Sequence, residues 1–141
     1  MIGSGTEWED AAEEVGRMLA ERRCTVITGG LDEVMAAAHR GAKAAGGMTI
    51  AILPGEDRAA ANAWADHVVV TGIGHARNLA VAASGDAVIA IGGSYGTIAE
   101  MALALRLGRT VVALAGAPEV EGVLRAETAE DAVELALRDL G

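Results

Sequence analysis

The chain has 141 residues, of which 52% are hydrophobic, and this combination predicts one folded domain over 1–141 and excludes intrinsic disorder. The formal net charge of −9 argues against nonspecific binding to nucleic acid or to an anionic membrane surface. A single cysteine excludes an intrachain disulfide, and the absence of a signal leader or of an apolar stretch of about 20 residues leads us to expect a cytoplasmic protein.

Short β-branched runs alternate with Ala-rich segments of helical periodicity. In chain order, these patterns predict a helix at 8–22, a strand at 24–28, a helix at 32–45, a strand at 48–53, a loop with one helical turn at 56–66, a strand at 68–71, a helix at 75–84, a strand at 87–91, a helix at 97–107, a strand at 110–114, and a helix from 128 to about 140. Asp32 is a candidate N-cap for the second helix, and Thr128 with Asp131 resembles a capping box.

The predicted strands are apolar on both faces and are separated by helices, which indicates right-handed βαβ units. We therefore expect an α/β fold: a Rossmann-like three-layer sandwich with a mostly parallel sheet and helices on both faces. Such folds open with a strand, yet only Met1-Ile2 precedes Gly3-Ser4-Gly5 here. The opening strand is expected to be very short or missing.

Ligands of such folds bind at the carboxyl ends of the strands, so the segments that follow the strands are the candidate site. Five of these segments contain glycine: Gly3-Ser4-Gly5, Thr28-Gly29-Gly30, Pro54-Gly55-Glu56-Asp57, Thr71-Gly72-Ile73-Gly74-His75 and Gly92-Gly93-Ser94-Tyr95-Gly96-Thr97. Glycine lets backbone N–H groups approach a ligand closely, although βα turns also use glycine without any ligand.

The segment from Gly92 to Thr97 leads directly into a helix, and free N–H groups at a helix start form an anion site. Phosphate is the expected occupant. Glu100 lies three residues beyond Thr97, so two interpretations are open. It is either the capping-box partner of Thr97, or a carboxylate directed at the rim as a general base or cation stabiliser.

Residues 25–114 resemble the Lonely Guy (LOG) type proteins, long mislabelled lysine decarboxylases. The family hallmark, P-G-G-x-G-T-x-x-E, corresponds here to Gly92-Gly93-Ser94-Tyr95-Gly96-Thr97-Ile98-Ala99-Glu100, and an upstream arginine segment corresponds to Gly74-His75-Ala76-Arg77-Asn78. Gly92 and Ser94 depart from the hallmark, and Asp32-Glu33 stands where the family usually carries glycine. The variant is closest to the short bacterial members, which include molybdenum-cofactor carrier proteins.

This resemblance implies particular roles for the candidate residues. Gly93, Ser94, Gly96 and Thr97 would hold a phosphate, Arg77 would position the substrate, and Glu100 would stabilise a ribosyl cation or activate water. The wider binding set contains Gly29, Gly30, Gly74 and Tyr95. The resemblance also implies a homo-oligomer, either a dimer or a tetramer, and the nearly all-apolar helix 97–107 favours a subunit interface.

Three functions are compatible with these residues. The first, which the sequence favours because both Arg77 and Glu100 are present, is a phosphoribohydrolase that cleaves the N-glycosidic bond of a nucleoside 5′-monophosphate. The second is a non-catalytic carrier of a phosphorylated cofactor such as molybdenum cofactor, and the third is a nucleotide sensor. Each predicts a bound phosphate or nucleotide-like ligand and requires no resident cofactor.

Two other chemistries are disfavoured by the sequence. Pyridoxal-phosphate decarboxylation needs a Schiff-base lysine, and the only lysine, Lys43, lies late in a helix. A metal site is not expected, because His39, His67 and His75 lack paired ligand spacing. His75 alone falls on the predicted rim, beside Arg77.

Overall fold

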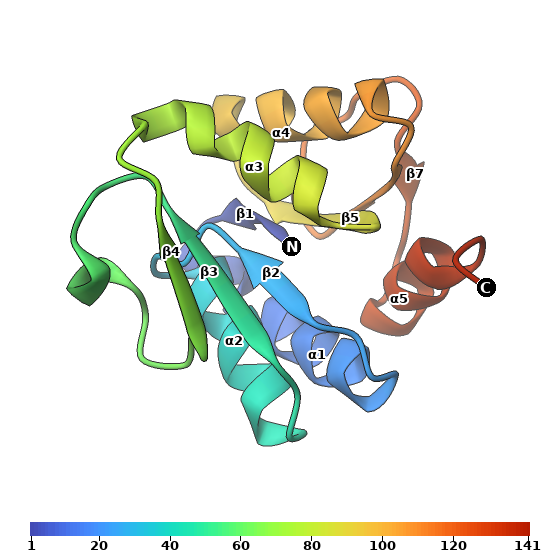
Figure 1. The fold of residues 1–141 in the computed structure, drawn as a ribbon. Coiled ribbons are helices and arrows are strands. Elements are labelled where there is room, and N and C mark those ends of the chain that lie inside the picture. The colour runs from blue at the N-terminus through green and yellow to red at the C-terminus, as the bar shows by residue number, and fades with distance from the viewer.

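The computed structural model describes residues 1–141 as a three-layer α/β sandwich, which confirms the predicted fold class (Figure 1). All the strand pairs are parallel. The strands are β1 (Ile2–Ser4), β2 (Val26–Thr28), β3 (Thr49–Leu53), β4 (His67–Val70), β5 (Ala87–Gly92), β6 (Thr110–Leu114) and β7 (Leu124–Arg125). The helices are α1 (Glu9–Glu21), α2 (Val34–Ala44), α3 (Arg77–Ser84), α4 (Tyr95–Arg106) and α5 (Ala129–Leu137), with short 3-10 turns at Thr6–Trp8, Arg58–Ala60 and Gly74–Ala76.

The strands form two hydrogen-bonded groups, in the orders β1-β5-β6-β7 and β2-β3-β4. β1 lies between them, because it pairs with β5 on one side and reaches β2 on the other. The contact with β2 is a single hydrogen bond, in which the Met1 amino group donates to the Ile27 carbonyl oxygen at 2.8 Å. The expected short opening strand is therefore present, with three residues.

Helices α1, α2 and α5 cover one face of the sheets, while α3 and α4 cover the other (Figure 1). Each face has its own core of small aliphatic side chains, because the chain has no phenylalanine. Val15 and Ile91 belong to the first core, and Met101 and Val111 belong to the second. This packing fixes the carboxyl ends of β1, β2 and β5 beside one another.

Helices α1 and α2 cross at two reciprocal glycines. A Cβ atom on Gly16 would overlap the backbone oxygen of Ala38, and one on Gly41 would overlap the backbone oxygen of Glu13. Both positions therefore need glycine for backbone contact, and both are helical. The helix pair holds the turns after β1 and β2 in place.

Several predicted boundaries were wrong. Helix α2 begins at Val34 with Glu33 at its N-cap position, so Asp32 is not the cap. Helix α4 begins at Tyr95, two residues before the predicted start at Thr97. The strand after Cys24 begins only at Val26, and α5 ends at Leu137.

The structure also contains elements beyond those predicted. Strand β7 is only two residues long, too short to give an alternating pattern. The predicted N-cap at Thr128 is confirmed, since its hydroxyl accepts a bond from the Asp131 N–H at 3.1 Å.

We expect Gly16→Ala to destabilise the protein by about 1–2 kcal/mol, because helix–helix overlap outweighs the roughly 1 kcal/mol that alanine adds to helix propensity. Urea unfolding measures the change. Gly55→Ala is the matched control, because a Cβ there meets open space, and its effect should stay within about 0.5 kcal/mol. A Gly16→Ala protein as stable as the wild type would contradict the close crossing.

Candidate functional site

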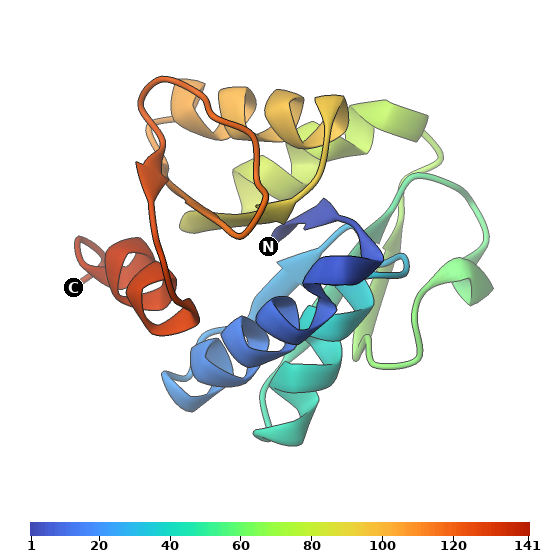
Figure 2. The ribbon, with the colours of Figure 1, turned by 180° about the vertical axis from the view of Figure 1, so that it is seen from behind.

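The candidate site lies at the carboxyl ends of β1 and β5, where Ser4 pairs with Gly92 (Figure 2). Strand order reverses here, because the chain passes from β1 toward β2 on one side while β5 continues the sheet on the other. Such a reversal leaves a crevice between the outgoing loops, and it is the usual ligand site of open α/β sheets. We call the turn after β1 together with the start of α4 the glycine shelf, comprising residues 3–5 and 92–97.

The first amides of α4 have no hydrogen-bond acceptor within the chain. The N–H groups of Tyr95, Gly96 and Thr97 donate to no acceptor within the chain, whereas the Ile98 N–H bonds to the Ser94 carbonyl oxygen at 3.0 Å. These free amides and the positive end of the helix dipole favour an anion. The predicted phosphate-binding segment therefore has the backbone geometry that the prediction needs.

Two glycines shape the turn before α4. Gly92 has φ of 59°, and a Cβ there would overlap the Ser4 carbonyl oxygen. Gly93 has φ of 102°, and a Cβ there would overlap the Thr97 side chain. Both positions thus require glycine, and Thr97 is almost fully buried beneath the turn.

Arg77 begins α3 and reaches across the ends of β2 and β3. Its Nη1 donates to the Ile52 carbonyl oxygen at 3.1 Å, and the guanidinium fills the space where Gly29 has no side chain. Burial lowers the pKa of Arg77. Its Nε is buried and has no hydrogen-bond partner within the chain.

Glu100 lies in the second turn of α4 and is partly buried. Burial raises its pKa from 4.5 to about 7, although the charge of Arg77 acts in the opposite direction. The two side chains do not form an ion pair. The capping-box interpretation of Glu100 was wrong, because Ser94 is at the N-cap of α4 and its side chain makes no capping bond.

Trp8 was absent from the predicted site, yet its ring lies against the shelf. A Cβ on Gly92 or on Gly116 would overlap the ring, and one on Gly5 would approach its Cδ1 atom to 3.0 Å. The ring thus packs across three glycine turns at the carboxyl ends of β1, β5 and β6. No sequence signal marked it, because an isolated tryptophan at a helix start has no characteristic spacing.

Glu33 is the second residue that the site prediction omitted. Its Oε2 accepts a hydrogen bond from the Gly5 N–H at 2.7 Å, so a carboxylate already occupies one amide of the shelf. Its backbone has φ of 58° and ψ of −126°, a conformation that glycine adopts far more readily. The signal in the sequence was Asp32-Glu33, which departs from the pattern that the family resemblance implies for this loop.

A buried polar network supports the turn after β2. The Asn62 amide donates to His39 Nδ1 at 3.3 Å, which leaves His39 Nε2 to donate to the Thr28 hydroxyl at 3.1 Å. The same hydroxyl accepts a bond from the Gly30 N–H at 2.9 Å. Burial lowers the pKa of His39 to about 4, so the imidazole is neutral and structural.

The remaining predicted residues differ in their surroundings. Gly30 packs against Ala51 and Leu53, which gives it a packing role. The Gly74 N–H bonds to the Pro54 carbonyl oxygen at 2.9 Å, while Tyr95 is 86% exposed. Lys43 pairs with Asp66 at 2.9 Å, at the amino end of β3 and away from the shelf.

Two further observations concern ligands and membranes. No three His, Cys, Asp or Glu side chains come together in a way that could hold a metal ion. None of the helices is both long enough and apolar enough to cross a bilayer.

Comparisons with known proteins agree with this architecture. A model of the SLOG cluster4 family matches residues 1–138, and the chain belongs to this family. An uncharacterized protein of Archaeoglobus fulgidus is 43% identical over 136 residues, which cover 94% of this chain and 89% of that protein.

Two solved structures are similar over nearly the whole chain. The molybdenum cofactor binding protein of Rippkaea orientalis has a TM-score of 0.89 at 32% identity, over 99% of this chain and 91% of that one. The molybdenum cofactor carrier protein of Chlamydomonas reinhardtii has a TM-score of 0.87 at 32% identity, over 97% of this chain and 90% of that one. The predicted resemblance to the LOG-like superfamily, and to its carrier-related members, is confirmed.

The raised pKa of Glu100 predicts a pH-dependent cost of folding. The unfolded carboxyl releases its proton near pH 4.5 and the folded one near pH 7, so this group destabilises the fold increasingly as pH rises through that window. Relative to wild type, Glu100→Gln should therefore gain stability from pH 4.5 to 7, by at most about 1.4 kcal/mol per pH unit, and no further above. Urea unfolding across this range measures the difference, and a constant difference would contradict the burial of the carboxyl.

Proposed function

We propose that this protein binds a phosphorylated cofactor at the glycine shelf and carries it without turnover, with molybdenum cofactor as the favoured ligand. Two observations carry the proposal: three free amides at the start of α4, and the partly buried guanidinium of Arg77, whose charge acts on Glu100 of the same helix. The similarity to a molybdenum cofactor binding protein and to a carrier protein supports the choice of ligand.

The α4 start is the proposed phosphate position. The amides of Tyr95, Gly96 and Thr97 supply donors that match phosphate oxygens, and the turn at Gly93 allows close approach. The turn after β1 is a poorer position, because the Glu33 carboxylate already accepts from Gly5 and would repel a phosphate. The ligand's phosphate is therefore assigned to the α4 side of the shelf.

Arg77 supplies the compensating charge. The protein has a net charge of −9, so an anionic ligand needs a local cation. Arg77 is held by Ile52 and Gly29 and retains an unpartnered Nε. Arg109 also has an unpartnered Nε. Its Nη2 donates to the Ala83 carbonyl oxygen near the amino end of β6, so this side chain lies away from the shelf.

A second candidate function is hydrolysis of a nucleoside 5′-monophosphate. The observation that favours it is the pKa of about 7 at Glu100, which is suited to acid–base work at neutral pH. A neutral carboxyl stabilises a ribosyl cation less well than a carboxylate does, and Arg77 does not hold Glu100 in an ion pair. These two features favour a cofactor carrier over a hydrolase.

We further propose that the protein is cytoplasmic and forms a homo-oligomer, either a dimer or a tetramer. Helices α3 and α4 form the outer layer on one face, where Leu79 is 48% exposed and Leu107 is 43% exposed. Although nearly all residues of 97–107 are apolar, α4 is not buried all round within one subunit, which supports the expected interface on this layer.

Arg77→Ala should weaken binding of inorganic phosphate and of AMP at least tenfold, which is about 1.4 kcal/mol, because a charge-assisted contact is lost. Trp8 fluorescence reports binding in a Trp64→Phe background, since Trp64 lies beside Thr49 at the opposite end of the sheet. Arg109→Ala is the matched control and should leave affinity unchanged. Equal affinities for the Arg77→Ala and wild-type proteins would reject the assigned site.

Glu100→Gln separates the two candidate functions. A carrier should retain co-purified cofactor after this substitution within about threefold, because the amides and Arg77 hold the phosphate. The protein would be expressed in a host that makes molybdenum cofactor, with molybdenum and pterin measured after purification. Release of free base from nucleoside 5′-monophosphates by wild type, lost in Glu100→Gln, would instead establish hydrolysis and overturn carriage.

A further inference from the structure

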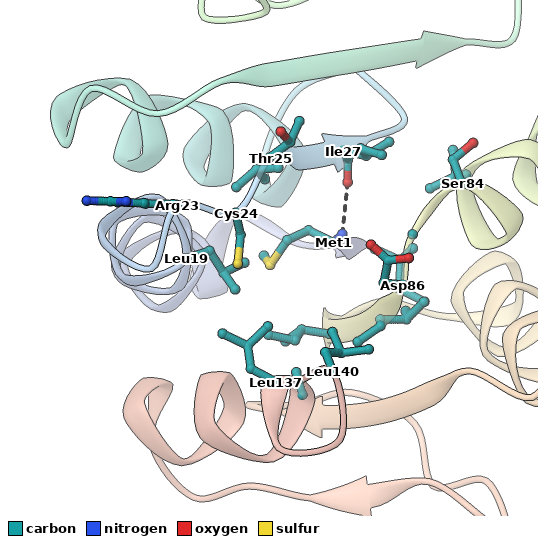
Figure 3. A pocket seen from close by; sticks show the side chains of 18 residues that line it. Met1, Leu19, Arg23, Cys24, Thr25, Ile27, Ser84, Asp86, Leu137 and Leu140 are labelled. Carbon is teal, nitrogen blue, oxygen red and sulfur yellow. Dashed lines mark hydrogen bonds between the residues drawn. The ribbon is translucent and has the colours of Figure 1, made fainter.

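The largest cavity of the molecule is separate from the glycine shelf. It has a volume of about 400 Å³ and lies between the amino-terminal halves of β2 and β5 (Figure 3). None of the residues that line it belongs to the shelf. The choice of ligand at the shelf therefore depends on the groups that the turns present, and not on the walls of this cavity.

One such group is the carboxylate of Glu33. This residue occupies the N-cap position of α2, yet its side chain makes no bond to the amides of that helix. Its Oε2 instead accepts a hydrogen bond from the Gly5 N–H at 2.7 Å, across 28 positions of sequence. The bond has the short length that is typical when the acceptor is a carboxylate. An acidic group of the protein thus lies on the turn after β1.

The loop that carries Glu33 holds the carboxylate in this place. The backbone of Glu33 has φ of 58° and ψ of −126°, a conformation that is strained for residues other than glycine. The loop is fixed on either side, because Val34 is fully buried and the Asn62 amide donates to the Leu31 carbonyl oxygen at 3.1 Å. Such strain persists only where the surrounding structure imposes it. The loop therefore directs the side chain of Glu33 toward Gly5.

The Gly5 turn lies directly beside the turn that leads to the proposed phosphate position. Ser4 pairs with Gly92, and neighbouring strands of a sheet are about 4.8 Å apart. A Cβ on Gly92 would overlap the Ser4 carbonyl oxygen, so the turns after β1 and β5 are in contact where they leave the sheet. The Glu33 carboxylate therefore stands on the side where a second phosphate would come, if the first were bound at the start of α4.

We propose that Glu33 determines the specificity of the shelf: its carboxylate takes the place of a second phosphate and restricts the site to ligands that carry a single phosphate group. The inference rests on the proposed function, because it takes the α4 amides as the position of the first phosphate. A ligand with a diphosphate would either displace the carboxylate from Gly5 or place its second phosphate against a like charge.

This selection works by rejecting the wrong ligand, and not by binding the right one more tightly. The net charge of −9 repels every anion in proportion to its charge, whereas Glu33 acts where a second phosphate would lie. Arg77 supplies one positive charge to the site, which suits a monophosphate better than a diphosphate.

The test measures the affinities of wild type and three variants for inorganic phosphate, pyrophosphate, AMP and ADP by calorimetry, without divalent cations. Glu33→Gly removes the carboxylate and suits the positive φ, so the loop should keep its conformation. Glu33→Gln removes the charge but keeps an oxygen that accepts from Gly5. Asp32→Gly is the matched control, because it also removes one negative charge and adds one glycine to this loop, while Asp32 is exposed.

We expect Glu33→Gly to raise the ratio of pyrophosphate affinity to phosphate affinity, and that of ADP to AMP, by about tenfold or more. Glu33→Gln should raise both ratios by about threefold, since it removes the repulsion but keeps the Gly5 amide occupied. Asp32→Gly should leave them within about twofold of wild type, because exposed charges are screened by salt. In Glu33→Gly, pyrophosphate should also shift the ¹H–¹⁵N signal of Gly5.

Unchanged ratios in both Glu33 variants, or an equal rise in Asp32→Gly, would overturn the inference and leave phosphate binding at α4 in place. A wild-type protein that binds neither phosphate nor AMP would instead reject the proposed function, and the inference with it. The phosphate and AMP affinities of the wild type thus distinguish the two failures.

Discussion

Three residues of β1 hold the two halves of the sheet and both turns of the candidate site in place. Ile2 packs into the core beneath α3 and α4, while Ser4 pairs with Gly92 at the point where strand order reverses. The Ser4 carbonyl lies so close to Gly92 that no side chain fits there. The position of the α4 amides is thereby set by a paired segment of only three residues.

The electrostatics of the shelf follow from burial in an acidic protein. Arg77 and Glu100 are both partly removed from water, which lowers the pKa of the first and raises that of the second. They remain close enough to influence each other but do not pair, so the guanidinium keeps its capacity for an incoming anion. Glu33 already accepts the Gly5 N–H, so in the proposed binding mode the anion lies at α4.

Hydrophobic patterning predicted most of the fold, because strands buried on both faces and Ala-rich helices differ clearly in period. Helix starts were harder to place. Tyr95 and Gly96 have no strong helical preference, so α4 seemed to begin at Thr97, and Glu100 was assigned to the first turn. The positive φ of Glu33 could not be predicted, since it depends on a contact with Gly5 that is distant in sequence.

The sequence pointed to some residues of the candidate site and missed others. The strand ends and the family motif located Arg77 and the glycine turns, because topology places all strand ends of a parallel sheet on one edge. Trp8 was not predicted, because its position depends on side-chain packing against glycines from three separate turns. Gly30 and His39 proved structural, since their partners come from β3 and from Asn62.

The most direct test of the shelf as an anion site is an NMR titration of ¹⁵N-labelled protein with inorganic phosphate and with AMP. We expect the largest shift changes at the amides of Gly96 and Thr97 and at the Arg77 Nε–H, with little change along 24–27. Changes concentrated away from the shelf, or no saturable change at α4, would contradict it.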